Sequence, residues 1–208
     1  MIIFIDTVSI KPRFIIYNNK NIINRQTIHL NNNSISETII KKLIAVSKKI
    51  NISLVQKICV CSGPGSYTAL RIGIAMAVGL KNSLNVPIYG ISAFDIFLHY
   101  FKLKFKYKNV CILIQSTNDQ NFLGIYNNNR SAITEPQKID YNYQISSNID
   151  EYPLLISNYT VDKKKFEFAN KFKIIRHIDI DKIVINIDFD KLNYNETKLI
   201  NPIYPVKK

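Results

Sequence analysis

One strand-to-helix junction constrains the fold of this chain more than any other feature. The short apolar run Ile58–Cys61 leads into the turn residues Gly63-Pro64-Gly65-Ser66, and a long apolar segment follows to about Leu84. Glycines at such a junction allow a tight turn and a close approach of two backbones. The pattern predicts a buried strand, a tight turn and then a long helix.

The junction is also a candidate anion site. The free amides at the start of a helix suit a phosphate or a carboxylate, which makes Gly63, Gly65 and Ser66 candidate ligands. Asp6 and Thr7, at the end of the first apolar run, could bind a hydrated Mg²⁺ or position a water. The sequence fits neither GxxxxGK[ST] nor GxGxxG, so an ordinary nucleotide loop is not predicted. A tight turn explains the glycines equally well, and an isolated Asp-Thr pair is more often a turn cap.

Three short strands precede the junction. Ile2–Ile5, Phe14–Tyr17 and Ile22–Leu30 are β-branched or aromatic runs, and Asn18–Asn21 separates the last two. Asparagine tolerates a positive φ and therefore favours a turn. The opening is predicted to be a β-meander.

A capped amphipathic helix is expected next. Ser34-Ile35-Ser36-Glu37 fits the S-x-x-E capping box, in which the two polar side chains satisfy free amides at the helix start. Apolar residues then recur at helical spacing: Ile35, Ile39, Leu43, Val46 and Ile50. The lysines between them are most simply a solvated face.

Strands and helices continue to alternate after the junction. Pro87–Ile91 reads as a strand, and Ser92 is expected to cap a helix that reaches about Tyr100. Val110–Ile114 and Phe122–Tyr126 look like two further strands. This order indicates an α/β layered fold with at least one sheet covered by helices.

Two segments have more than one interpretation. Phe101–Lys108 alternates apolar residues with lysine, which fits a half-buried strand or a helix end that frays into a loop. Residues 180–187 fit either a helix or a strand. The alternating lysines are candidates for contact with nucleic acid, although a lysine-lined edge usually deters aggregation: Lys102, Lys104, Lys106 and Lys108.

Composition sets limits on function and location. The chain has 208 residues, enough for one large domain or two small lobes, and 28 Lys and Arg against 15 Asp and Glu give a net charge of +13. This charge favours anionic partners, but abundant Ile, Asn, Lys and Tyr also fit a genome rich in AT codons. Three cysteines without CxxC and three scattered histidines predict a reducing compartment and no metal. Apolar runs too short for a signal peptide or a membrane span lead us to expect a cytoplasmic protein.

Small residues in the long helix suggest close packing. Ala69, Gly73 and Ala77 lie four apart, and Ala75 and Gly79 form a second pair. Such a stripe admits another backbone, which is either a neighbouring element of this chain or a helix of another subunit.

Other groups of polar residues are weaker evidence for a catalytic or metal site. Ser66 has no identifiable His/Asp partnership, so a serine hydrolase is not supported. Four aspartates near the end of the chain show no metal-ligand pattern: Asp179, Asp181, Asp188 and Asp190.

Taken in order, the motifs resemble those of the TsaB family, also called YeaZ. The resemblance rests on Ile2–Thr7, the capped helix, the run Gly63–Ala75 and then Pro87–Ser92. The run Gly63–Ala75 is close to the family pattern GPGSFTGLRIGLA. Asp119 and Tyr126 fit the ends of a D-A-R-x-x-E-V-Y element, and three late residues fit a final L-x-x-P-x-Y: Leu199, Pro202 and Tyr204.

Several positions depart from the family pattern. Ala69 stands where the family usually has Gly, and Ile35 where a His is common. Asn121 and Gly124 replace the Arg and Glu of the middle element, and Pro205 replaces a Leu. At these positions the side chains of the family pattern are replaced.

The resemblance implies the actin/Hsp70/sugar-kinase type of fold, with two α/β lobes. We expect the first, partner-binding lobe to comprise residues 1–100 and about 192–208, and a divergent second lobe to comprise 101–191. It also implies a non-catalytic subunit, without cofactor or metal, that pairs with a TsaD-like enzyme in the threonylcarbamoyladenosine modification of tRNA. A TsaE-like ATPase would join this complex, and the chain would contact tRNA indirectly through the complex. The free chain could pair with a second copy of itself.

The partner is expected on the helices of the first lobe, where the family motifs lie. The residues expected to contact it are Ser36, Glu37, Ile40, Thr68, Leu70, Arg71, Gly73 and Ala77. Asp6, Thr7, Gly63, Gly65 and Ser66 would form a vestigial phosphate site.

Two other functions compete with this one. An ATP-dependent phosphotransferase or ATPase of the same fold would use Asp6 and the turn Gly63–Ser66. A stand-alone basic RNA-binding protein would account for the charge, but the sequence contains no recognisable RNA-binding module.

Overall fold

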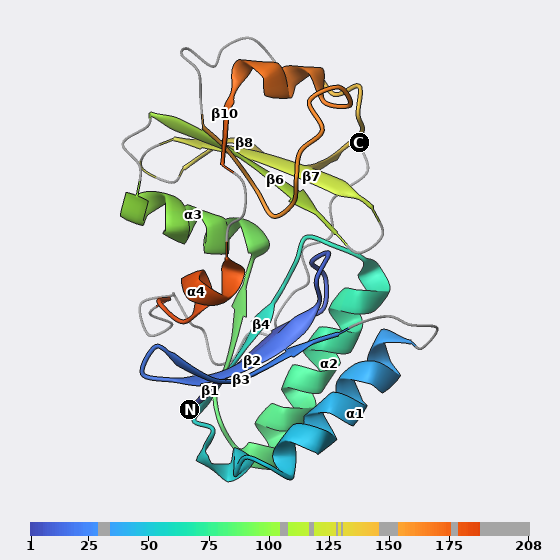
Figure 1. Cartoon of the computed structure of the whole chain (residues 1–208), viewed down its shortest axis with the longest axis vertical. Helices are drawn as coiled ribbons and strands as arrows, with labels where there is room; N and C mark the ends of the chain where they lie inside the picture. The colour runs from blue at the N-terminus through green and yellow to red at the C-terminus, as the bar shows by residue number, and fades with distance from the viewer. Residues whose placement is uncertain are drawn as a thin grey trace.

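A computed structural model describes residues 1–28, 34–104, 108–116, 119–127, 129, 131–145, 154–175 and 179–187. Two five-stranded mixed sheets lie one above the other, with helical segments between them and on the outer side of each (Figure 1). The predicted α/β layered fold is therefore confirmed. The polar break at 31–33 and the motif with Leu199, Pro202 and Tyr204 lie outside the described residues.

The first sheet has the strand order β3-β2-β1-β4-β5. The strands β1 (Ile2–Asp6), β2 (Arg13–Asn18) and β3 (Asn21–Thr27) form the predicted antiparallel meander. At its turn, Asn19 and Lys20 both have positive φ, 45° and 66°. The strands β4 (Lys57–Cys61) and β5 (Ile88–Ile91) add in parallel on the other side of β1, after a short 3₁₀ turn, η1 (Ile52–Leu54).

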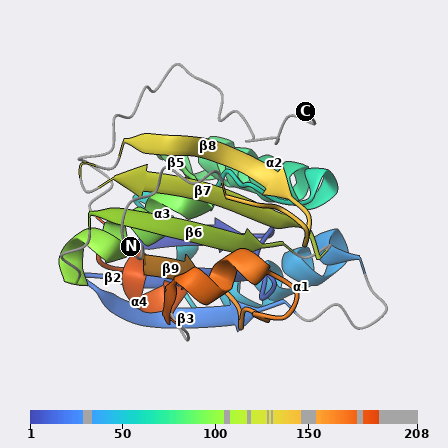
Figure 2. The same ribbon diagram turned by 90° about the horizontal axis from the view of Figure 1, so that it is seen from above.

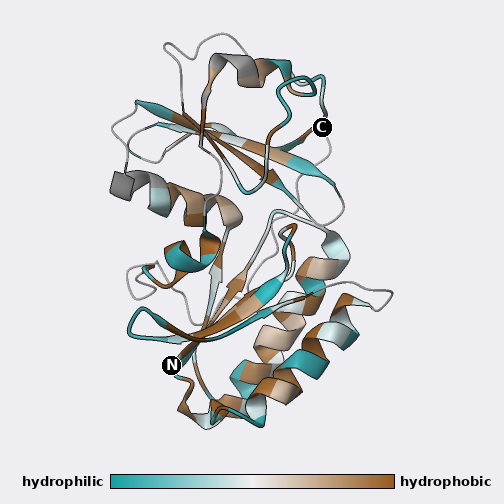
Figure 3. Ribbon diagram, in the orientation of Figure 1, coloured by the Kyte–Doolittle hydropathy of each residue, from teal (hydrophilic) through white to brown (hydrophobic). Residues whose placement is uncertain are grey.

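Helices α1 (Ile35–Ser47) and α2 (Tyr67–Leu84) lie side by side on one face of this sheet (Figure 1). The Ser34 hydroxyl accepts a hydrogen bond from the Glu37 amide, as the capping box predicts. Ser66 caps α2, and Asn85 in the left-handed conformation ends it. Figure 3 shows hydrophilic and hydrophobic stretches mixed along α1, whereas α2 is hydrophobic or neutral over most of its length.

The second sheet has the order β10-β9-β6-β7-β8. The predicted strands β6 (Asn109–Gln115) and β7 (Asn121–Asn127) form a hairpin that β8 (Ala132–Ile139) extends, and Figure 2 shows the three side by side. The strand β9 (Leu154–Ser157) runs parallel to β6, and β10 (Lys173–Ile175) runs parallel to β9. A 3₁₀ turn, η2 (Glu167–Lys171), precedes β10.

Helices α3 (Ala93–Lys104) and α4 (Ile180–Val184) lie between the two sheets (Figure 1). The Ser92 hydroxyl accepts from the Asp95 amide at 2.9 Å and donates to its carboxylate at 2.6 Å, so the predicted cap is present. Because α3 extends to Lys104, the strand interpretation of Phe101–Lys108 is wrong for its first half. Of the ambiguous residues 180–187, Ile180–Val184 form a short helix.

The alternation of each strand divides the core into three clusters. Ile3 and Phe14 face α1 and α2, whereas Phe4 and Ile15 face the space between the sheets. Val110 and Phe122 of the second sheet belong to that same central cluster. The far face of the second sheet packs against η2. A single apolar cluster therefore joins the two sheets. None of the helices in the described part of the chain is long and apolar enough to cross a membrane.

Candidate functional site

The end of β1 forms a hydrogen-bonded turn around Asp6. The Asp6 side chain is buried, and its Oδ1 accepts from the amides of Val8 at 3.0 Å and Ser9 at 3.1 Å. An Asp side chain that bonds its own backbone a few residues on is a common turn device. The Asp6 side chain thus makes the hydrogen bonds of a turn cap.

The β4–α2 turn packs directly on the residues after β1. The Thr7 hydroxyl donates to the Ala69 carbonyl at 2.6 Å, and both residues are buried. A Cβ atom added at Gly65 would lie 2.5 Å from the Cβ of Val8, well inside the contact limit. Gly65 is therefore needed because the two turns approach closely.

The other two residues of the expected phosphate site also serve local structure. Gly63 has a φ of 108°, and its carbonyl accepts from the Ala93 amide at 2.7 Å. The Ser66 hydroxyl accepts from the Ala69 amide at 3.5 Å as the N-cap of α2. The structure brings Asp6, Thr7 and the turn residues together, and it places each of them against another part of the chain.

The space beside Asp6 is a small cavity. We call it the interlobe cavity, and its volume is about 10 Å³. Its walls include Asp6, Ser9 and Pro64 from the turns of the first sheet, Ile114 of β6, Asn158 just after β9, and Ile180 of α4. A volume of about 10–15 Å³ holds one water molecule. A nucleotide would need these walls to separate.

The outer face of α1 and α2 carries several of the residues expected to bind a partner. Glu37, Thr68 and Arg71 are exposed, Ser36 is half-buried, and the Ile40 side chain is 52% exposed. Sequence reasoning missed Ile44, which follows Ile40 by one helical turn and is 51% exposed. It also missed Tyr67, over whose ring the Arg71 guanidinium lies at 5.2 Å. Their spacing of four residues was the available signal.

Three of the expected partner-binding residues lie inside the chain. Leu70 and Ala77 are fully buried, and a Cβ added at Gly73 would lie 2.5 Å from the Thr7 hydroxyl. The stripe Ala69, Gly73 and Ala77 faces the chain's own sheet, which favours the intrachain interpretation. The second small pair has the opposite environment: Ala75 is exposed, and a Cβ at Gly79 would meet no atom within 4 Å.

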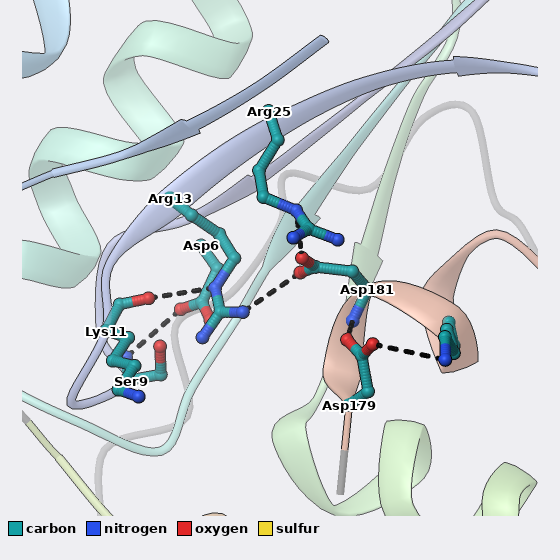
Figure 4. Close-up of polar contacts among 8 residues, drawn as sticks. Asp6, Ser9, Lys11, Arg13, Arg25, Asp179 and Asp181 are labelled. Atoms are coloured by element: carbon teal, nitrogen blue, oxygen red, sulfur yellow. Dashed lines mark hydrogen bonds and ion pairs between the residues drawn. The ribbon is translucent and has the colours of Figure 1, made fainter. Parts of the chain in front are cut away.

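Asp181 forms an ion-pair cluster with two arginines (Figure 4). The carboxylate is buried, its Oδ1 lies 2.9 Å from Arg13 Nη1, and its Oδ2 contacts Arg25 Nε. Asp179 accepts from the Asp181 amide as the N-cap of α4. No grouping of His, Cys, Asp or Glu suited to a metal occurs among the described residues, a set that does not include Asp188 and Asp190.

The residues that match the middle family element, from Asp119 to Tyr126, also contact other parts of this chain. Asn121, at the start of β7, is buried and accepts from the Tyr159 hydroxyl at 3.1 Å. Tyr126 is buried beside Phe94, and burial raises the pKa of its hydroxyl, with Asp95 adding to the effect. A Cβ at Gly124 would lie 2.9 Å from the Tyr126 ring.

The chain matches a family model described as TsaD, tRNA N6-adenosine threonylcarbamoyltransferase, over residues 30–192. It is similar to tRNA threonylcarbamoyladenosine biosynthesis protein TsaB of Buchnera aphidicola subsp. Schizaphis graminum, with 28% identity over 99 residues, 48% of this chain and 47% of the relative. The protein of the same name from Bacillus subtilis is 49% identical over 39 residues, 19% of this chain and 17% of the relative. The matched part of the chain thus spans about half the length of the Buchnera relative and less than a fifth of the Bacillus relative.

Two solved structures share the fold. YeaZ from Pseudomonas aeruginosa superposes with a TM-score of 0.57 at 13% identity, covering 88% of each chain. A structure titled as an uncharacterized protein with similarity to peptidase YEAZ from Pseudomonas aeruginosa gives a TM-score of 0.62 at 14% identity, covering 99% of this chain and 98% of the other. At such identities the likeness concerns the fold, which is that of the actin/Hsp70/sugar-kinase type.

Proposed function

The chain belongs to the TsaB/YeaZ family, and we propose that it acts in the threonylcarbamoyladenosine modification of tRNA as a non-catalytic subunit that binds and activates a TsaD-like enzyme. A TsaE-like ATPase and tRNA belong to the same assembly in this proposal, and the chain contacts tRNA through the complex. The assembly works in the cytoplasm.

The observation that carries the proposal is the outer face of α1 and α2. Ile40 and Ile44 lie one turn apart on α1, and each exposes about half of its side chain. On the neighbouring helix α2, Ala75 and Gly79 are exposed and have little or no side chain, so another helix could approach α2 closely there. Glycine in the middle of an exposed helix costs roughly 0.5–1 kcal/mol relative to alanine. A second helix that packs closely against α2 would give Gly79 a use that the chain itself does not provide.

The packing around Asp6 argues against the phosphotransferase alternative. The turn residues that would hold a phosphate contact Val8, Ala69 and Ala93 instead, and the interlobe cavity is water-sized. At this turn, the described residues therefore leave no more than a water-sized space for a phosphate.

The test compares two exposed apolar sites. The double variant Ile40→Glu/Ile44→Glu should weaken binding to the TsaD-like protein of the same genome by about 30-fold or more, the loss expected when apolar residues at the centre of an interface are replaced. The matched control is Ile133→Glu on β8, where the side chain is 49% exposed and lies in the second sheet. Calorimetry with the purified partner gives the affinities.

Each result has a clear meaning. Because all three side chains are exposed, the substitutions should change stability by no more than about 0.5 kcal/mol. Unchanged affinity in the double variant contradicts this docking face, and the absence of binding by the unaltered chain contradicts the subunit function. Sedimentation of the chain alone, before and after Ile40→Glu/Ile44→Glu, shows whether a second copy uses the same face.

A further inference from the structure

We propose that α4 is a latch that closes the interlobe cavity, held shut by the Asp181 carboxylate between Arg13 and Arg25. The proposal concerns the space between the two sheets and does not depend on the function proposed above.

The ion pairs join α4 to strands that lie far from it in sequence. Arg13 pairs with Thr27 in the β2–β3 register, so Arg25, two residues from Thr27, lies on the same face as Arg13. Each carboxylate oxygen of Asp181 meets a different arginine (Figure 4). Arg13 is oriented further by a hydrogen bond from its Nε to the Lys11 carbonyl at 2.9 Å. Charge-assisted bonds of this kind are stronger than neutral ones.

Helix α4 has little intrinsic stability of its own. It contains five residues, and isolated helices shorter than about 12–15 residues are marginal in water. Its apolar residues Ile180, Ile183 and Val184 are buried in the central cluster beside α3. The helix therefore stays in place through this packing and through Asp181. The Lys182–Asp179 pair is exposed and contributes little.

A buried thiol on the wall of the same cavity can report on the opening of the latch. Ile180 and Cys61 both line the interlobe cavity, and Cys61 is only 2% exposed. Cys111 is also buried, but it lies on the opposite face of the second sheet, in the cluster with Val161 and Phe166. Movement of α4 alone exposes Cys61 and leaves Cys111 covered. Unfolding of the whole chain exposes both.

The experiment measures thiol labelling of the folded full chain. Iodoacetamide is added under native conditions, and the labelling rates of Cys61 and Cys111 are read from peptide masses. Asp181→Asn should speed labelling of Cys61 by about 10- to 100-fold, the factor expected when a hydrogen bond to a charged group is lost. The Cys111 rate should stay within about twofold, because local opening leaves the rest of the fold intact.

A matched control removes the same charge elsewhere. Asp162 is an exposed aspartate that accepts from the Lys164 amide at 3.0 Å, and Asp162→Asn should leave both rates unchanged. If Asp181→Asn does not fold, Arg25→Gln removes one of the two partners, and it should still speed labelling of Cys61 relative to Cys111. A Cys61 rate that does not change in a folded variant overturns the latch. An equal rise at Cys61 and Cys111 also overturns it, because it reports global destabilisation.

Discussion

Two glycines of α2 show how one residue type serves opposite purposes. Gly73 faces the Thr7 side chain, and a Cβ there would lie 2.5 Å from the hydroxyl that bonds Ala69. Gly73→Ala should therefore lower the free energy of unfolding by about 1–3 kcal/mol, the usual cost of overpacking. Thermal unfolding measures it as a fall in Tm of about 2–4 °C for each kcal/mol.

Gly79 in the same helix is the matched control. A Cβ there meets no atom within 4 Å, so Gly79→Ala keeps the packing and removes the conformational cost of glycine. It should raise stability by roughly 0.5–1 kcal/mol. If both variants shift Tm in the same direction, the close approach of α2 to Thr7 does not set the requirement for Gly73.

At the scale of elements, the inner strands β4 and β6 carry three buried thiols. Burial raises the pKa of Cys59, Cys61 and Cys111 well above the ordinary value of a thiol, so the folded chain keeps them neutral. Unfolded thiols ionise at about pH 8.5. Their contribution to stability is complete below that pH and is lost as the pH rises toward the folded pKa values.

The free energy of unfolding should fall with rising pH at a predictable slope. Each thiol should lower the free energy of unfolding by about 1.4 kcal/mol per pH unit above its unfolded pKa. Urea titrations at pH 7.5, 9.0 and 9.5 under reducing conditions measure the slope. Cys111→Ser should reduce this slope by the contribution of one thiol, whatever the substitution does to the free energy of unfolding at neutral pH. An identical slope in that variant would mean that Cys111 ionises equally in both states.

Elements with local signals could be predicted from the sequence. The caps at Ser34, Ser66 and Ser92 are each satisfied within three residues, and the meander turn depends on Asn18–Asn21 alone. The edge strand β8 was missed, because an edge strand tolerates Pro136 and exposed residues that hide the period-two pattern. Residues 101–104 read as a strand by their alternation, yet α3 continues through them.

The candidate site was only partly predictable, because its contacts are between residues distant in sequence. The sequence indicated Asp6 and Gly63–Ser66 as candidates, and in the structure Asp6 and Pro64 line the same cavity. It could not show that Thr7 fills the space at Gly73, or that Arg13 meets Asp181, 168 residues further along the chain. The inner and outer faces of α2 both carry small residues, so only the structure distinguishes the packed stripe from the open one.

At the scale of the whole molecule, the question is whether the two expected lobes unfold separately or as one unit. The sequence predicts a first lobe of residues 1–100 with about 192–208 and a second lobe of 101–191, and this division stays a proposal. The central cluster contains Phe4 and Cys59 of the first sheet, Phe97 of α3, and Val110 and Phe122 of the second sheet. A shared core of this kind favours unfolding as a single unit.

Phe168 lies on the far side of the second sheet and tests this coupling. It is buried in the cluster that packs β6, β7 and β9 against η2, with no part of the first sheet in that cluster. Phe168→Ala should cost about 3–5 kcal/mol. If the core is shared, the most protected amides of β4 and β6 exchange only on global unfolding, and both should speed up by the same factor. Hydrogen exchange with mass spectrometry measures the two strands in one sample. Faster exchange in β6 with an unchanged rate in β4 would show instead that the lobes unfold independently and that the central cluster is an interface between them.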